Sequence, residues 1–174
     1  MARLFLALWP DAAEQAALRH HQRAWHWRPG SALVQPDQLH LTLHFLGPVP
    51  REQLAALGAA LQVPHEPFSL RFDQPALWRH GLAVLCASEV PAGLAQLHTA
   101  LAEALRAQQR PVESRPLAPH ITLARRAGGS MPPDLPPALH WQVRAYVLVE
   151  SVPGRGADYR VLRHYPSSAS PPPQ

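Results

Sequence analysis

His40-Leu41-Thr42-Leu43 and His120-Ile121-Thr122-Leu123 are two nearly identical tetrapeptides in a chain of 174 residues. The chain has only three threonines, and two of them follow a histidine at this same spacing. In a β-strand, alternate side chains point to the same face. Each tetrapeptide, formed as a strand, therefore places an imidazole beside a hydroxyl and leaves aliphatic side chains on the opposite face. The repetition predicts two equivalent strands that each carry one histidine and one threonine.

The residues around both tetrapeptides support this prediction. Residues 39–46 alternate between apolar and polar side chains, which is the period-two pattern of a strand with one buried face. We expect Phe5 and Phe45 in the core; the alternative is that either one borders a base pocket. A Gly-Pro pair ends the first strand. Pro119 opens the second, predicted over residues 119–125, because proline is tolerated at the start of a strand.

The rest of the chain alternates between predicted strands and helices. Further strands are predicted at 2–8, 67–74 and 81–88, the last two paired around residues 78–81. Helices are predicted at 11–27, capped by Asp11, at 50–62 and at 91–109. Residues 139–150 and 157–165 form a predicted hairpin. The order strand, helix, motif strand occurs twice, which indicates an α+β fold of two similar lobes related by a pseudo-twofold axis.

Two histidines on facing strands suit the transfer of a phosphoester. A neutral imidazole takes a proton from the nucleophile, and a charged imidazolium gives one to the leaving oxygen. The nonbridging phosphate oxygens need hydrogen-bond donors, and the hydroxyls of Thr42 and Thr122 are suitable groups. His40, His120 and these two threonines are therefore the principal candidate site residues.

The paired motifs resemble those of the two-histidine phosphoesterase superfamily. Within it, the chain is most similar to the bacterial and archaeal RNA 2',3'-cyclic phosphodiesterases, also called 2'-5' RNA ligases. The resemblance extends to residues 3–10 (RLFLALWP), 40–47 (HLTLHFLG) and 148–151 (LVES), the last followed by Gly156 and Tyr159. It covers residues 2–166, nearly the whole chain.

The resemblance implies a fold and a reaction. Residues 1–166 would form one bilobal domain in which two antiparallel sheets, with helices outside, face each other across a central cleft. The activity would be hydrolysis of an RNA 2',3'-cyclic phosphate to a 2'-phosphomonoester, without metal or other cofactor. His40 would be the proton donor and His120 the proton acceptor, although the symmetry of the motifs leaves that order open in the sequence. The reverse reaction would form a 2'-5' linkage.

Four further residues are candidates for substrate binding. His44 lies on the polar face of its predicted strand and either reaches the rim of the cleft or is solvated. Arg125 and Arg126 point to opposite sides, and simple alternation favours Arg126 for the cleft face, whereas a β-bulge would favour Arg125. Tyr159 either stacks on a base or packs within the hairpin.

Composition limits the other classes of protein. No apolar run reaches the length of a membrane span, and the single cysteine, Cys86, excludes an internal disulfide. We therefore expect a cytoplasmic monomer. The net charge is +4 and all 16 basic residues are arginine. This suits an RNA partner, but GC-rich codon usage is the stronger explanation. Residues 167–174 are predicted to be a disordered tail.

Two other functions remain open. A related enzyme would act on small cyclic nucleotides, and a module that had kept the fold without the chemistry would only bind RNA. The second is disfavoured because a pure RNA-binding surface has no need of an acid–base pair.

Overall fold

The computed structural model describes residues 1–135, 137–154 and 158–168. In these residues the α-helices are α1 (Ala12–Arg23), α2 (Leu54–Ala60) and α3 (Ala92–Ala107), with 3-10 turns η1 (Pro36–Gln38), η2 (Arg51–Gln53) and η3 (Arg79–Gly81). The strands are β1 (Ala2–Leu8), β2 (Ala32–Leu33), β3 (Leu41–Val49), β4 (Phe68–Phe72), β5 (Gln74–Trp78), β6 (Leu82–Cys86), β7 (His120–Arg125), β8 (Leu139–Val143), β9 (Ala145–Val152) and β10 (Asp158–Pro166).

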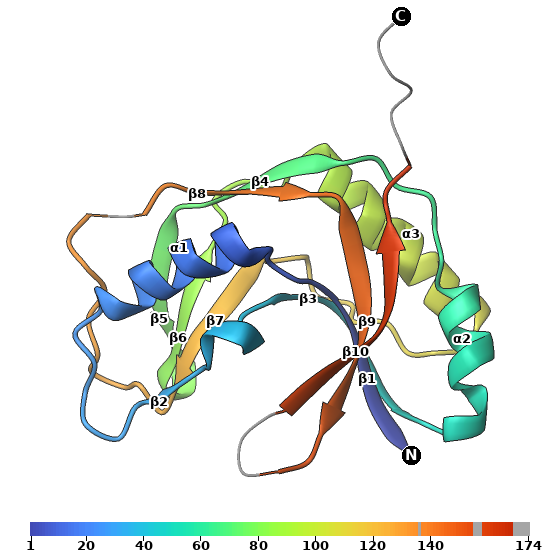
Figure 1. The fold of residues 1–174 in the computed structure, drawn as a ribbon, viewed down its shortest axis with the longest axis horizontal. Helices are drawn as coiled ribbons and strands as arrows, with labels where there is room; N and C mark the ends of the chain where they lie inside the picture. The colour runs from blue at the N-terminus through green and yellow to red at the C-terminus, as the bar shows by residue number, and fades with distance from the viewer. Residues whose placement is uncertain (136, 155–157, 169–174) are drawn as a thin grey trace, which may run out of the picture.

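Antiparallel pairing joins most of these strands into one sheet. Its order is β10-β9-β1-β3-β7-β6-β5, with β2 beside β7, while β4 and β8 form a separate two-stranded sheet. The two motif strands, β3 and β7, are neighbours through the pair Leu41 and Ile121. The expected α+β class with antiparallel sheets is confirmed. Figure 1 shows α1 at one end of the molecule and α2 and α3 at the other.

A strand–helix–strand unit occurs twice, as expected. In the first, β1 and β3 pair in antiparallel fashion and α1 lies between them in the chain. In the second, β6 and β7 pair in the same way, with α3 between them. The two units place each motif on the second strand of its pair.

Two of the predicted strands are each divided between two sheets. Most of residues 67–74 form β4, which ends at Phe72 and pairs with β8. Only Gln74 belongs to β5, which pairs with β6 across the turn η3, so the predicted pairing around residues 78–81 is made by β5. Residues 139–150 likewise divide into β8 and β9, because the chain leaves the small sheet at Arg144 and enters the large one. The hairpin of β9 and β10 is confirmed.

The helices follow the local signals, but α1 is shorter than predicted and the helix predicted at 50–62 divides into η2 and α2. Asp11 caps α1 and forms a reciprocal capping box with Glu14, as its position predicts. This helix ends at Arg23, short of the predicted residue 27. The apolar stripe of α3 is confirmed: Leu94, Leu97, Leu101 and Leu105 are buried.

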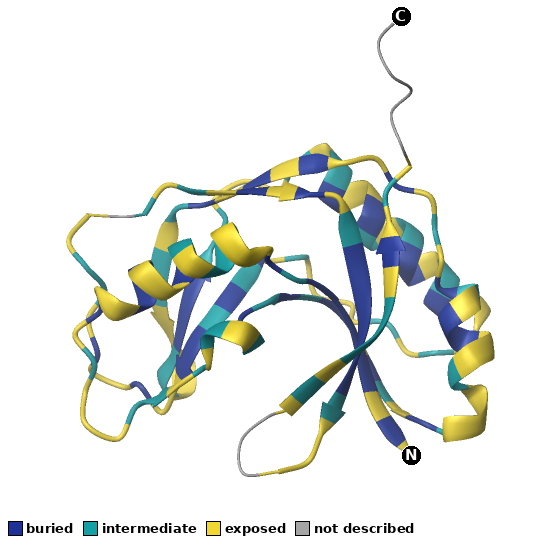
Figure 2. Ribbon diagram, viewed as in Figure 1, coloured by how far each residue is buried: buried dark blue, intermediate teal, exposed yellow. Residues whose placement is uncertain are grey.

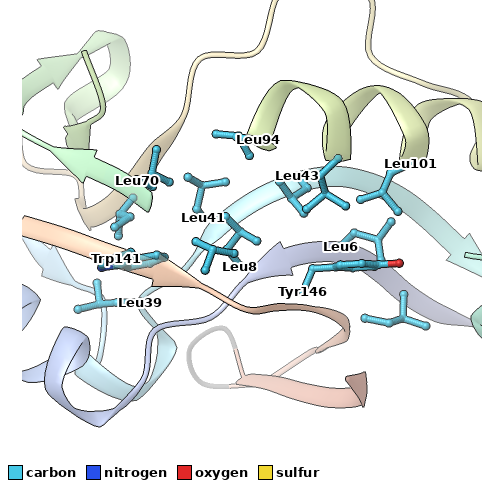
Figure 3. Packing of buried hydrophobic residues seen from close by; sticks show 14 of the residues in the cluster. Leu6, Leu8, Leu39, Leu41, Leu43, Leu70, Leu94, Leu101, Trp141 and Tyr146 are labelled. Carbon is cyan, nitrogen blue, oxygen red and sulfur yellow. The ribbon is translucent and has the colours of Figure 1, made fainter. Parts of the chain in front are cut away.

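The main core lies between one face of the large sheet, the helices and the small sheet. Figure 2 shows the buried residues concentrated along the central strands, with exposed residues on the outward faces of α1 and α2. In Figure 3, leucines of β1 and β3 meet Leu94 and Leu101 of α3 on one side and Trp141 and Tyr146 of β8 and β9 on the other. Burial of these side chains supplies the main stabilising term of the fold.

The predicted tail lies mostly outside the described residues, since residues 169–174 are not described. Ser167 and Ser168, which belonged to the predicted disordered segment, donate backbone hydrogen bonds to the carbonyls of Arg144 and His65. These two hydrogen bonds hold Ser167 and Ser168 against the folded domain.

A buried carboxylate links the end of the β9–β10 hairpin to η2. Glu150 is 3% exposed and accepts hydrogen bonds from Arg51, at 2.8 Å, and from Arg160. Burial raises the pKa of Glu150, but the hydrogen bonds from the two arginines outweigh it, so the pKa lies below its ordinary value.

Glu150→Gln should destabilise the protein at neutral pH by about 1.5–3 kcal/mol, because charge-assisted hydrogen bonds are lost. The pKa of Glu150 is lowered in the folded state, so its contribution is present above the ordinary value of about 4.3 and is lost as the pH falls through the lowered one. Urea unfolding at several pH values measures this. Glu113→Gln removes the exposed carboxylate paired with Arg115 and should change nothing. A Glu150→Gln deficit that persists unchanged in acid would contradict the assignment.

Candidate active site

His40 and His120 are held in the same way. The Nδ1 of His40 lies 2.7 Å from the carbonyl oxygen of Gln38, and the Nδ1 of His120 lies 2.8 Å from that of Ala118. A carbonyl only accepts, so each Nδ1 carries the hydrogen. In both neutral rings the Nε2 is therefore the unprotonated nitrogen, and it is the atom that gains or releases a proton.

The pairing of the motif strands aligns the four principal residues. Antiparallel pairing of Leu41 with Ile121 sets a register in which His40 aligns with Thr122 and His120 with Thr42. The charge of His120 acts on the pKa of His40, which agrees with this proximity. The structure thus brings both histidines and both threonines together, as the sequence predicted.

Each motif strand has a β-bulge at the fourth residue of its tetrapeptide. In β3 the partners of Leu6 and Ala7 are His44 and Thr42, so Leu43 is the extra residue. In β7 the partners of Ala83 and Val84 are Ala124 and Thr122, so Leu123 is the extra residue. A bulge reverses the alternation of faces beyond it. The fifth residue after each histidine then returns to the histidine's own face.

The bulge in β3 corrects the expected places of His44 and Phe45. His44 is only 4% exposed, and its Nε2 donates to the carbonyl of His98 at 2.9 Å. Its ring stacks on the His98 ring at 4.0 Å, against α3. The expectation that His44 shares the face of His40 is therefore wrong. Phe45, expected in the core, is 68% exposed and lies 6.2 Å from the ring of Phe5, which itself contacts His40.

The bulge in β7 decides between the two arginines. Arg125 is exposed on the face of His120, and its positive charge acts on His40. Arg126 follows the end of the strand with a φ of 52°, in the left-handed region. Simple alternation, which favoured Arg126, is wrong here, and the bulge that would favour Arg125 is present.

Aromatic rings surround His40 on three sides. Trp9 stacks on it at 4.8 Å with nearly parallel planes, and Tyr159 and Phe5 approach at 5.0 and 5.1 Å. Tyr159 also meets Phe5 edge-on, so this ring both packs the hairpin and borders the site. Sequence reasoning missed Trp9, which stands in the opening stretch of the family resemblance. It also missed Trp78, whose ring lies 4.5 Å from His120.

The two histidines differ in their surroundings. Burial lowers the pKa of His40 to about 4, and the charges of Arg125 and His120 act in the same direction, while the hydrogen bond to Gln38 opposes them. Thr42 and Thr122 are half-buried. Cys86, which pairs with His120 across β6 and β7, has its thiol pKa raised by burial.

A family model matches residues 9–153, and its description is the 2'-5' RNA ligase superfamily. This chain belongs to that superfamily. A Thermus thermophilus protein called RNA 2',3'-cyclic phosphodiesterase is 35% identical, over 94% of this chain and 89% of its own length. The Escherichia coli protein of the same name is also 35% identical, over 78% of this chain and 80% of its own.

Solved structures agree with the superfamily assignment. Escherichia coli LigT in complex with 3'-AMP superposes with a TM-score of 0.84 at 31% identity, covering 97% of this chain and 99% of that one. The resemblance drawn from the two motifs is thus confirmed. Among the described residues of this superfamily member, no helix is long and apolar enough to cross a membrane. Those residues also contain no group of three or more His, Cys, Asp or Glu side chains placed to hold a metal ion.

Replacing Trp9 by Leu should raise the pKa of His40 from about 4 towards the ordinary value of about 6.5, because water then reaches the ring. NMR titration of the histidine resonances, with His40 assigned from a His40→Gln variant, measures the shift. Trp27→Leu is the matched control, since Trp27 stacks on Trp25 instead. A His40 pKa that moves equally in both variants would show that Trp9 is not the group that excludes water.

Proposed function

We propose that this protein hydrolyses the 2',3'-cyclic phosphate at an RNA 3' end to a 2'-phosphomonoester, without a metal or other cofactor. The observation that carries the proposal is the pair of histidines whose Nδ1 atoms are fixed by carbonyls, leaving two Nε2 atoms for proton transfer. The names of the Thermus and Escherichia relatives support the substrate class. The 3'-AMP complex of Escherichia coli LigT supports a nucleotide as the ligand.

The two halves of the sheet would form pseudo-symmetric lobes facing across a central cleft. Four features support this arrangement: the repeated strand–helix–strand unit, the matched bulges, the matched histidine hydrogen bonds, and the single residue pair that joins β3 to β7. A phosphate on such an axis meets one histidine and one threonine from each strand. Both histidines come from the same chain, so the site is complete in a monomer.

In the proposed reaction the Nε2 of His120 takes a proton from water, whose oxygen attacks phosphorus. The bond from phosphorus to the 3' oxygen breaks, and the Nε2–H of charged His40 gives its proton to that oxygen. The product is a 2'-phosphomonoester and a free 3'-hydroxyl. Equivalent rings on opposite sides of the phosphate suit a displacement in line. With a 5'-hydroxyl RNA end in place of water and the reaction reversed, the same groups would form a 2'-5' linkage.

The low pKa of His40 bears on its assignment as the proton donor, because a donor must carry the proton before the reaction. With a pKa of about 4, His40 is neutral at pH 7 in the free protein, and its charged form is a strong acid. An anionic phosphate beside the ring raises that pKa and favours the charged form. A low pKa also suits a base, so the order of the two roles rests on the family resemblance and needs a direct test.

The remaining residues have supporting roles in this proposal. The hydroxyls of Thr42 and Thr122 donate to the nonbridging oxygens, and Arg125 adds a positive charge on the same face. Tyr159 borders the ring of His40 and is placed to contact the nucleoside. His44 packs against α3, and Arg126 lies past the end of β7, so neither takes part in the proposed contacts.

His40→Ala and His120→Ala should each lower kcat about 10²–10⁴-fold on cyclic-ended RNA with EDTA present, because each removes one proton-transfer group. The double variant should lose little more, since the two act as a unit. His140→Ala changes an exposed histidine of β8 and should retain full activity. Near-normal turnover in either active-site variant would refute the proposal.

A substrate with sulfur in place of the bridging 3' oxygen should separate acid from base. A thiol is a better leaving group, with a pKa near 8.5, and needs no proton donor. His40→Ala should recover most of its lost rate on this substrate, whereas His120→Ala should not. Recovery in the His120 variant instead would reverse the two roles.

Thr42→Val and Thr122→Val should lower the rate of the chemical step more than they weaken RNA binding. Valine keeps the branched shape and removes only the hydroxyl, which we place where charge changes during transfer. Single-turnover kinetics separate the two effects. Thr99→Val, in the third threonine of the chain, exposed on α3, is the control. Weaker binding with a normal chemical rate would reduce the threonines to positioning groups.

A further inference from the structure

A basic groove lies between α1 and η1. It encloses about 390 Å³ and is lined by Pro36 and, on α1, by two alanines, Gln15, Arg19, His20 and Arg23. We call these residues the α1 groove. Gln15 joins its two walls, because its side-chain amide donates to the carbonyl of Pro36 at 2.9 Å. Figure 2 shows the outward face of α1 as largely exposed.

Both walls of the α1 groove lead to His40. Helix α1 begins at Ala12, three residues after Trp9, whose ring stacks on His40. The other wall, η1, ends at Gln38, whose carbonyl holds the Nδ1 of His40. Both walls of the groove therefore continue in the chain into residues that contact His40.

The groove carries positive charge without acidic lining residues. Arg19 and Arg23 are one turn apart on the exposed side of α1, and His20 adds a charge when protonated. Within the described part of the chain, neither arginine forms a salt bridge, whereas Arg51 and Arg160 are both engaged by Glu150. A guanidinium that is not held by a carboxylate is available to a phosphate.

The length of the groove matches a polymer better than a mononucleotide. Arg19 and Arg23 stand seven and eleven residues after Ala12, a rise of about 10 and 17 Å along the helix. At a rise of about 3.4 Å per stacked nucleotide, these charges lie a few nucleotides away from a phosphate held at His40. Ala12 and Ala16, which precede the two arginines on α1, have small side chains that leave room for a sugar–phosphate backbone.

We propose that the α1 groove binds the RNA backbone a few nucleotides on the 5' side of the cyclic end, with Arg19 and Arg23 contacting its phosphates. This inference rests on the proposed function and names RNA, rather than a cyclic mononucleotide, as the preferred substrate. The contact is the same in substrate and transition state, so it should act on KM and leave kcat unchanged.

The test compares Arg19→Gln/Arg23→Gln with Arg106→Gln/Arg110→Gln. The second pair has the same four-residue spacing and the same loss of charge, and it lies at the end of α3, at the opposite end of the molecule (Figure 1). Substrates are a cyclic-ended oligonucleotide of ten residues and the corresponding cyclic mononucleotide. Binding of the 2'-phosphate-ended oligonucleotide, measured by fluorescence anisotropy against salt, is a readout that needs no turnover.

The α1 variant should raise KM for the oligonucleotide about tenfold at low salt and reduce the salt slope of binding by roughly 1.4, for two phosphate contacts. Its kcat, its kinetics on the mononucleotide and its thermal midpoint should match those of the α3 variant. If both variants have the same KM for the oligonucleotide, the proposed groove contact is refuted. It is also refuted if the α1 variant loses the same activity on the oligonucleotide and on the mononucleotide, because the effect would then lie at His40. If the wild type hydrolyses neither substrate, the proposed function fails, and anisotropy still decides whether the groove binds RNA.

Discussion

The bulges at Leu43 and Leu123 are the constraint on which the site depends. An extra residue leaves a backbone carbonyl outside the regular ladder, and that carbonyl needs a donor. The carbonyl of Leu123 receives hydrogen bonds from the side chain of Gln22 on α1 and from the backbone of Val34. On the other side, the carbonyl of Leu43 bonds the His98 ring of α3 and raises its pKa, although burial lowers the pKa of that ring overall.

Each helix therefore does more than cover the core. Because α1 and α3 supply polar side chains to the two bulges, they stabilise the reversal of faces in β7 and β3. That reversal brings Arg125 and Phe45 onto the faces of His120 and His40 and turns His44 inward. Beyond the matched bulges, the two motif strands thus carry different side chains on the faces of the histidines, a cation in β7 and an aromatic ring in β3.

The surroundings of His40 hold its ring rigidly and also disfavour its protonated form. Trp9, Phe5 and Tyr159 exclude water and fix the ring, and the same burial disfavours its protonated form. In the proposed reaction an anionic phosphate beside the ring would offset this cost and couple the protonation state of His40 to occupancy of the site. In the described part of the chain, His120 contacts one aromatic ring, that of Trp78, whereas His40 contacts three. The asymmetry between the histidines comes from their neighbours and not from the motifs.

The sequence by itself determined the motif strands, the stripe of α3 and the capping of α1 by Asp11, and it named the four principal candidate residues. These features depend on alternation, helical periodicity and local hydrogen bonds, which short stretches of chain carry. Only the tertiary structure decided that Arg125 and Phe45 replace Arg126 and His44 on the faces of the histidines, that Trp9 and Trp78 flank them, and that residues 139–150 serve two sheets. The physical reason is that a bulge and a change of sheet are set by the partners of a strand: Gln22 is 101 residues from the carbonyl of Leu123 that it bonds, a contact that only folding creates.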